Sequence, residues 1–128
     1  MAIHYKGSLK RNPQTGLKSW YGTTVLQDEI TAEQLGELIA KRSTFSKGDS
    51  TGVLLMVGEI IAEQLADSRP VRVAGLGSWR PSVHSRPELT EDKVDDDSII
   101  QPATVIYNAG SEIDKAMKNT KYKKEPKP

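Results

Sequence analysis

A long apolar run that leads into a glycine-rich turn constrains this sequence most. It lies within residues 46–79, SKGDSTGVLLMVGEIIAEQLADSRPVRVAGLGSW. Its apolar residues recur at the spacing of a helix face, and Ser46 and Asp49 supply a start signal. Pro70 cannot continue the helix, and residues 71–73 then alternate as a half-buried strand. The pattern predicts a long capped helix, a short strand and a bend.

The first half of this helix is apolar on every side. Residues 53–57 read VLLMV, so no single packed face could cover all of them. Their burial requires two partners, such as the rest of the same fold and a second subunit.

Weaker signals lie on either side of this stretch. Thr31 and Gln34 form a capping box for a helix that ends near Arg42. Residues 103–107 are expected to form a strand, and residues 109–118 a final helix with one apolar stripe. The order of elements is a helix pair, a sheet and a last helix.

Three short motifs carry a resemblance to a known family. They are Ser-Lys-x-Asp at residues 46–49, Gly-x-Gly-Ser-Trp at 75–79 and Tyr-Asn-Ala-Gly at 107–110. Together they resemble the HU and IHF histone-like DNA-binding proteins of bacteria. The resemblance implies an α+β, HU-like (IHF-like) fold with a helix pair, a sheet with an arm and a C-terminal helix. The extra N-terminal stretch looks most like the HU-related branch of Bacteroidetes.

The resemblance also sets the expected organisation. Residues 1–30 would be an added β-hairpin, residues 31–118 the HU-like domain, and residues 119–128 a basic, disordered tail. Both the family and the all-round apolar helix imply a homodimer. The expected dimer core contains Leu54, Val57, Ile61, Leu65, Trp79 and Tyr107.

The turn of the N-terminal hairpin contains residues 11–16, RNPQTG. HU proteins carry a matching hexapeptide at the tip of the arm that embraces DNA, but here it lies far upstream. The resemblance implies that Pro13 wedges between base steps from the minor groove, an action for which HU and IHF are standard examples. Lys10 and Arg11 would then contact phosphates. The alternative is that these residues simply make a good turn.

Residues 80–104 occupy the place of the family's arm but have the wrong charge for DNA. Three basic residues oppose six acidic ones, a net charge of −3, and no proline lies where the arm tip would fall. Because lysine and arginine drive phosphate binding, this arm is poorly suited to embrace DNA. An acidic arm could instead contact a protein partner.

Charge is concentrated at the two ends of the chain. Residues 1–20 carry +4 and residues 111–128 carry +3, so the remainder carries −6 within a total of +1. The basic ends are therefore expected to supply most of the DNA contacts. The candidate DNA-binding residues are Lys10, Arg11, Pro13, Arg80, His84, Arg86, Lys121, Lys123 and Lys124.

Nothing in the sequence favours an enzyme, a metal site or a cofactor. There is no cysteine, and neither histidine has the i, i+4 partner of a helical zinc site. The acidic residues 95–97 lack the spacing of a calcium loop. No segment approaches the roughly 20 apolar residues of a membrane span, and a cytoplasmic, nucleoid-associated protein is expected.

Two functions follow from these observations. The leading prediction is a histone-like, sequence-independent architectural DNA-binding protein that acts as a dimer. The alternative is an HU-fold structural or protein-interaction module that has lost DNA binding, and the acidic arm favours this alternative.

Overall fold

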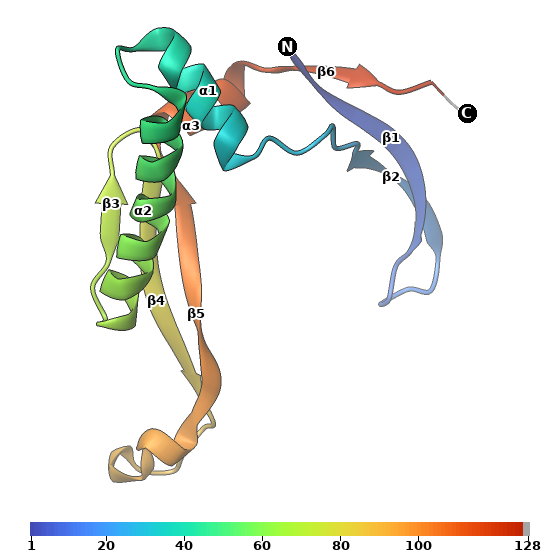
Figure 1. The fold of residues 1–128 in the computed structure, drawn as a ribbon. Coiled ribbons are helices and arrows are strands. Elements are labelled where there is room, and N and C mark those ends of the chain that lie inside the picture. The colour runs from blue at the N-terminus through green and yellow to red at the C-terminus, as the bar shows by residue number, and fades with distance from the viewer. Residues whose placement is uncertain (127–128) are drawn as a thin grey trace. The chain divides into compact units, whose positions relative to one another are not determined.

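The computed structural model describes residues 1–126, which form two compact units (Figure 1). The terminal unit comprises Met1–Glu29 and the chain from Lys115 onward, and the central unit comprises Ile30–Asp114. Residues 115–126 therefore belong with the N-terminal residues, and residues 127–128 of the predicted tail lie outside the described residues. None of the helices in residues 1–126 has the length and hydropathy that a bilayer crossing needs.

The central unit begins with the predicted helix pair. Helix α1, Ala32–Arg42, starts at the expected capping box, in which Thr31 and Gln34 satisfy each other's backbone N–H groups. Helix α2, Lys47–Ala66, starts at Ser46, whose hydroxyl accepts a hydrogen bond from the backbone N–H of Asp49. The two helices approach closely at Gly36, which is buried against Thr51 of α2 and leaves no room for a Cβ atom.

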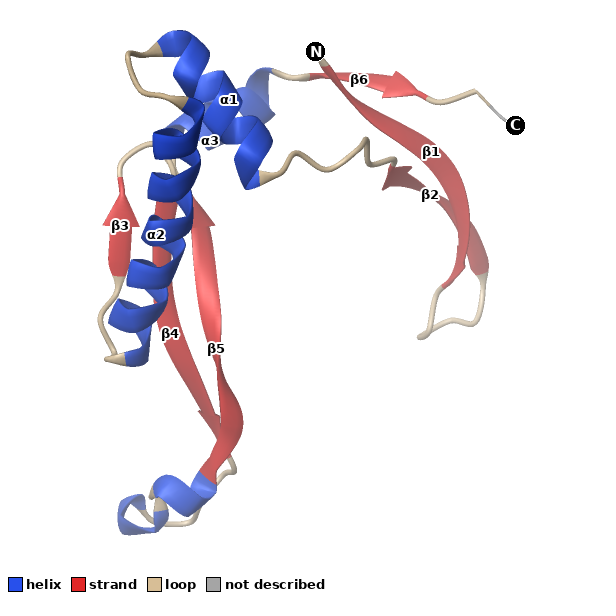
Figure 2. Ribbon diagram, in the orientation of Figure 1, coloured by secondary structure: helices blue, strands red, loops and turns tan. Residues whose placement is uncertain are grey.

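An antiparallel sheet with the order β3-β4-β5 packs against α2 (Figure 2). Its strands are β3 (Val71–Val73), β4 (Gly77–Ser85) and β5 (Ile99–Ala109). The register aligns Val71 with Trp79 and Trp79 with Tyr107, so these three side chains share one face. The rings of Trp79 and Tyr107 lie 5.3 Å apart between centroids, at a tilt suited to aromatic packing.

The final helix, α3, spans Ser111–Asn119 and so begins two residues later than predicted. Ala109 instead ends β5, and the N–H of Gly110 donates to the carbonyl oxygen of Leu76 at 3.2 Å. This bond ties the start of α3 to the turn between β3 and β4. The spacing of apolar residues along a helix does not reveal such a backbone contact. The sequence therefore predicts a start of α3 that is two residues too early.

Gly77 has the backbone conformation that most restricts substitution in that turn. Its φ of +138° is one that L residues rarely adopt, and an added Cβ atom would overlap the carbonyl oxygen of Asn108 and the ring of Tyr107. We expect Gly77→Ala to lower the free energy of unfolding by about 2–4 kcal/mol, measured by urea denaturation. The control is Gly48→Ala in the exposed first turn of α2, where nothing lies near the added methyl group and stability should not fall. Equal stability of Gly77→Ala and the wild type would contradict this account.

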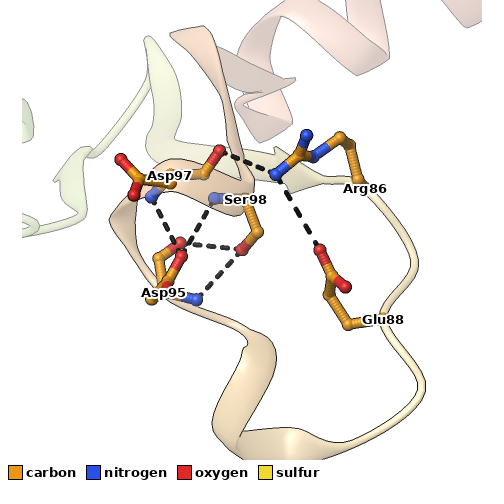
Figure 3. A network of polar contacts seen from close by, with 5 residues as sticks. All are labelled: Arg86, Glu88, Asp95, Asp97 and Ser98. Carbon is orange, nitrogen blue, oxygen red and sulfur yellow. Dashed lines mark hydrogen bonds and ion pairs between the residues drawn. The ribbon is translucent and has the colours of Figure 1, made fainter.

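The arm region forms two extended strands joined by a structured loop. Strand β5 begins at Ile99, four residues before the predicted start, and its pairing with β4 is interrupted by an irregularity between Ser82 and His84. The connecting residues 86–98, which we call the acidic loop, contain two short 3-10 helices, Glu91–Lys93 and Asp96–Ser98. The carboxylate of Asp95 caps the second of these helices by accepting from the N–H groups of Asp97 and Ser98 (Figure 3).

The terminal unit is a three-stranded sheet of order β2-β1-β6. The predicted hairpin is confirmed, with β1 at Ala2–Arg11 paired antiparallel to β2 at Lys18–Thr24. The prediction of a disordered tail is wrong for β6, Lys121–Lys124, which pairs in parallel with the start of β1. Backbone groups make these bonds whatever the side chains are, and the free edge of β1 supplies their partners. The side chains of His4 and Glu125 add a polar contact between the two segments.

Candidate nucleic-acid interface

The two units carry opposite charge. Residues 1–29 and 115–128 contain ten lysines and arginines against three acidic residues, a net charge of +7. Residues 30–114 contain eight basic residues against fourteen acidic ones, a net charge of −6. The formal charge of +1 is therefore the sum of a strongly basic unit and an acidic unit. A basic unit of this kind attracts polyanions at long range.

Seven of the ten basic residues of the terminal unit lie on its strands. Strand pairing places the predicted hairpin and tail candidates on one sheet, because β6 lies beside the start of β1 while Lys10 and Arg11 end the same strand. Roughly 20 Å of extended strand separates Tyr5 from Arg11, at about 3.3 Å per residue. The three strands carry no acidic residue. Their seven basic side chains, all exposed, are Lys6, Lys10, Arg11, Lys18, Lys121, Lys123 and Lys124.

Side chains alternate between the two faces of this sheet. Gly7 and Gly22 are paired, with the ring of Trp20 against Gly7 and that of Tyr5 against Gly22, so both rings lie on one face. The register adds Tyr122, which is level with Ile3. We call this side the aromatic face; it comprises Ile3, Tyr5, Leu9, Arg11, Lys18, Trp20, Tyr122 and Lys124. The opposite side, the lysine face, comprises Lys6, Lys10, Tyr21, Lys121 and Lys123.

The hairpin tip is an exposed, internally bonded turn. The side chain of Asn12 accepts a hydrogen bond from the N–H of Gln14 at 2.9 Å, and its backbone carbonyl accepts from the N–H of Gly16 at 2.7 Å. Gly16 has a φ of +72°, which suits glycine at this position. Pro13 is exposed within this turn. The hexapeptide is thus used for turn formation, and its proline remains free to contact a ligand.

The central unit supplies a second, smaller basic surface. Arg80 of β4 is exposed on the sheet face opposite Trp79, and the pairing of Arg72 with Ser78 places both arginines on that face. A hollow of about 480 Å³ lies between Arg72, Arg80 and Asn108. Strands β3, β4 and β5 contain no acidic residue. Arg72 is not among the residues predicted from the sequence, although the alternation of residues 71–73 places its side chain on the face opposite the two valines.

Two other predicted contacts are engaged within the central unit. The guanidinium of Arg86 donates to the carbonyl oxygen of Asp97 at 3.1 Å and lies 3.9 Å from a carboxylate oxygen of Glu88 (Figure 3). Arg86 therefore helps to hold the acidic loop, where six acidic residues oppose two basic ones. The ring nitrogen Nε2 of His84 lies 3.4 Å from the hydroxyl of Thr104. A role in DNA contact stays a prediction for both residues.

Four of the six predicted dimer-core residues line two apolar hollows. Ile61, Leu65 and Trp79 line a cavity of about 440 Å³ between α2 and the strands β4 and β5. Leu54 instead lines a cavity of about 150 Å³ with Ile39 and Phe45. Val57 is half-buried, and Tyr107 packs on Trp79 while its hydroxyl donates to the carbonyl oxygen of Leu76 at 2.7 Å.

Apolar side chains remain uncovered throughout this unit. No hydrophobic residue among residues 1–126 is fully buried, and Val53, Leu55 and Met56 of α2 are each more than half exposed. Within the described part of the chain, no three acidic or histidine side chains are gathered closely enough to hold a metal ion. The surfaces considered for function are thus the basic terminal sheet, the face of the central sheet that carries Arg72 and Arg80, the acidic loop and the open apolar core.

Comparison with known proteins agrees with this architecture. Residues 1–124 match the family model described as an HU domain fused to a winged helix-turn-helix, an immunoglobulin or a glycine-rich motif. No curated protein sequence gives a match. A crystal structure from Bacteroides vulgatus, described as that of a candidate bacterial DNA-binding protein, aligns with a TM-score of 0.68 and 12% identity. That alignment covers 96% of this chain and 48% of the Bacteroides chain, so this chain spans about half its length.

The second similar structure is HU from Anabaena, in a cocrystal with DNA. It aligns with a TM-score of 0.52 and 19% identity, over 70% of this chain and 99% of the HU chain. The resemblance read from the sequence motifs is therefore confirmed, and so is the predicted α+β fold class. The chain belongs to the HU-HIG family of HU-domain proteins, and its helix pair, sheet and final helix form an HU fold.

Proposed function

We propose that this protein binds duplex DNA without sequence preference, mainly through the sheet of its terminal unit. The observation that carries the proposal is the set of seven exposed basic side chains on three strands that hold no acidic residue. Lysines and arginines in such an array bind phosphates and release condensed counterions. Phosphate contacts position a protein on DNA but read no bases, so the binding is independent of sequence.

The remaining contacts follow from the positions of the predicted residues. Lys10 and Arg11 would contact phosphates next to the hairpin tip, and Pro13 at the tip would enter the minor groove. HU and IHF are standard examples of such minor-groove wedges. Arg72 and Arg80 would add phosphate contacts from the central unit. This mode of binding corresponds to an architectural protein of the nucleoid.

We further propose that two copies form the active species. An apolar core that stays open in one chain requires a covering surface, because the removal of apolar area from water drives association. The groove lined by Ile61, Leu65 and Trp79 is the place where a second copy would pack. A dimer would also double the number of basic sheets that one assembly presents to DNA, which raises avidity.

The direct test is the binding of a short fluorescent duplex at several salt concentrations, with the molar mass checked by light scattering. If five cationic side chains contact phosphates, the logarithm of the affinity should fall against the logarithm of the salt concentration with a slope near −4.5. Two duplexes of unrelated sequence should give the same affinity. Absence of binding at low salt would contradict the proposal.

The second candidate function is a protein-interaction module with an HU fold. It is favoured by the acidic loop, whose carboxylates would repel a DNA backbone and whose tip is held in a defined shape by Asp95 and Arg86. A dimer that shows no affinity for DNA at low salt would support this second function.

A further inference from the structure

The aromatic face of the terminal sheet has a property that phosphate binding does not use. Trp20 and Tyr122 are 72% and 69% exposed, although tryptophan is a residue that proteins usually keep largely buried. Tyr5 is half-buried between them on the central strand. The three rings come from three different strands and are spread over roughly 20 Å of the length of β1.

The rings share their face with cationic side chains. Arg11 and Lys18 are paired at one end of the sheet, and Lys124 is level with Tyr5 at the other end. The carboxylate of Glu125, which follows β6, is in contact with the ring of His4. The face therefore combines exposed aromatic surface with positive charge. A ligand that matches both properties is an anion with flat rings that are not already stacked or paired.

A hollow beside Trp20 could hold one ring of such a ligand. Its volume is about 550 Å³, and it lies between the ring of Trp20, the backbone of Gly7 and the segment Lys124, Glu125 and Pro126. Its size is within the range of roughly 300–1,000 Å³ that small-ligand pockets occupy. A base lying on Trp20 would have its phosphate within reach of the ammonium group of Lys124.

We propose that the aromatic face binds single-stranded DNA, with bases stacked on Trp20 and Tyr122 and phosphates held by Arg11, Lys18 and Lys124. Duplex DNA cannot make the same contacts, because its bases are already stacked on one another. Aromatic side chains that stack with bases in a basic groove are the usual means of binding single strands without sequence preference. The inference goes beyond duplex binding, since it assigns the rings and not only the charges of the sheet.

The test measures the affinity of the full-length protein for a fluorescent 15-nucleotide oligothymidine and for a 15-base-pair duplex. Stacking on one ring contributes about 1–3 kcal/mol by alanine substitution, which corresponds to a 5- to 150-fold loss. We expect Trp20→Ala to weaken oligothymidine binding by that factor and to change duplex binding less than twofold. Trp20→Phe keeps a ring and should retain most of the affinity.

The matched control is Tyr21→Ala. Tyr21 is an adjacent, exposed aromatic residue of the same strand, but it lies on the lysine face, so the affinity for oligothymidine should stay at the wild-type value. Tryptophan fluorescence gives an independent readout, because oligothymidine should quench Trp20 and the quenching should be absent in Trp20→Phe. Circular dichroism of each variant checks that the sheet is retained.

The outcomes separate this inference from the proposed function. Wild-type protein that binds the duplex but not oligothymidine would overturn the inference and leave the function intact. Wild-type protein that binds oligothymidine through Trp20 but does not bind the duplex would support the inference and contradict the proposed function. Equal losses of affinity for oligothymidine and for the duplex in Trp20→Ala would also overturn the inference. So would a Trp20→Ala variant whose molar mass changes while both affinities stay at wild-type values.

Discussion

Replacement of Ile61 by aspartate is expected to convert the proposed dimer into a monomer and to lower stability by several kcal/mol. Ile61 lines the apolar groove with Leu65 and Trp79, and one chain alone leaves it only half-buried. In the dimer the partner would complete its burial. A carboxylate at this position would be desolvated without a counter-charge, which is among the most costly changes that a packed interface can suffer.

Light scattering after size-exclusion chromatography measures this effect, since the wild type should elute at twice the chain mass of 14.1 kDa. Ile61→Val is the matched control, because it removes one methylene group, costs about 0.5–1.5 kcal/mol and should leave the dimer in place. An aspartate variant that remains dimeric at the same concentration would show that this groove is not the interface.

Removal of five charges from the terminal sheet is expected to abolish most of the salt dependence of DNA binding. The variant replaces Lys10, Arg11, Lys121, Lys123 and Lys124 by glutamine, which removes the charge but keeps a polar side chain and the backbone bonding. Each lost phosphate contact flattens the logarithmic salt slope by about 0.9, so the total change should reach about 4.5 units. Fluorescence anisotropy of a labelled duplex between low and moderate salt measures the slope.

The control for this variant changes the same amount of charge on the central unit. It replaces five exposed basic residues by glutamine: Lys41, Arg42, Lys47, Arg69 and Lys93. We expect its slope to differ from that of the wild type by less than about one unit. If both sets flatten the slope equally, the protein would be responding to net charge alone, and the sheet would not be the binding site.

Local signals were sufficient to predict the helix pair and the glycine turn of the central unit. Thr31 and Ser46 cap helices because their hydroxyl groups reach backbone N–H groups within one turn, and α2 ends at Ala66, four residues before Pro70, which cannot continue a helix. The turn at Gly77 was visible as a glycine motif. These features depend on neighbours a few residues apart, so sequence spacing alone reveals them.

The terminal sheet was only half predictable, because β6 depends on a distant partner. Lys121–Lys124 is a run of lysines and tyrosine with little strand preference, and only the free edge of β1 makes it a strand. The sequence alone therefore did not show that the basic residues of the hairpin and of the tail lie on one sheet. Nor did it show the aromatic face, since the shared side of Trp20, Tyr5 and Tyr122 follows from the pairing register.

The structure of the acidic loop was also only partly predictable from the sequence. The capping of a 3-10 helix by Asp95 is a short-range signal that the sequence contains, but the unbroken run of three aspartates obscured it. The hydrogen bond from Arg86 to the carbonyl oxygen of Asp97 spans eleven residues and depends on the folded arm. For that reason Arg86 was assigned to DNA on charge alone, whereas the structure gives it an intramolecular partner.

The central claim is that DNA binds to the terminal sheet and not to the arm. Two-dimensional NMR of the ¹⁵N-labelled protein, titrated with a short duplex, tests it most directly. The account predicts shifts in the backbone signals of β1, β2 and β6 and little change in the acidic loop, residues 86–98. Shifts concentrated in residues 80–104, with the signals of the terminal sheet unchanged, would contradict it.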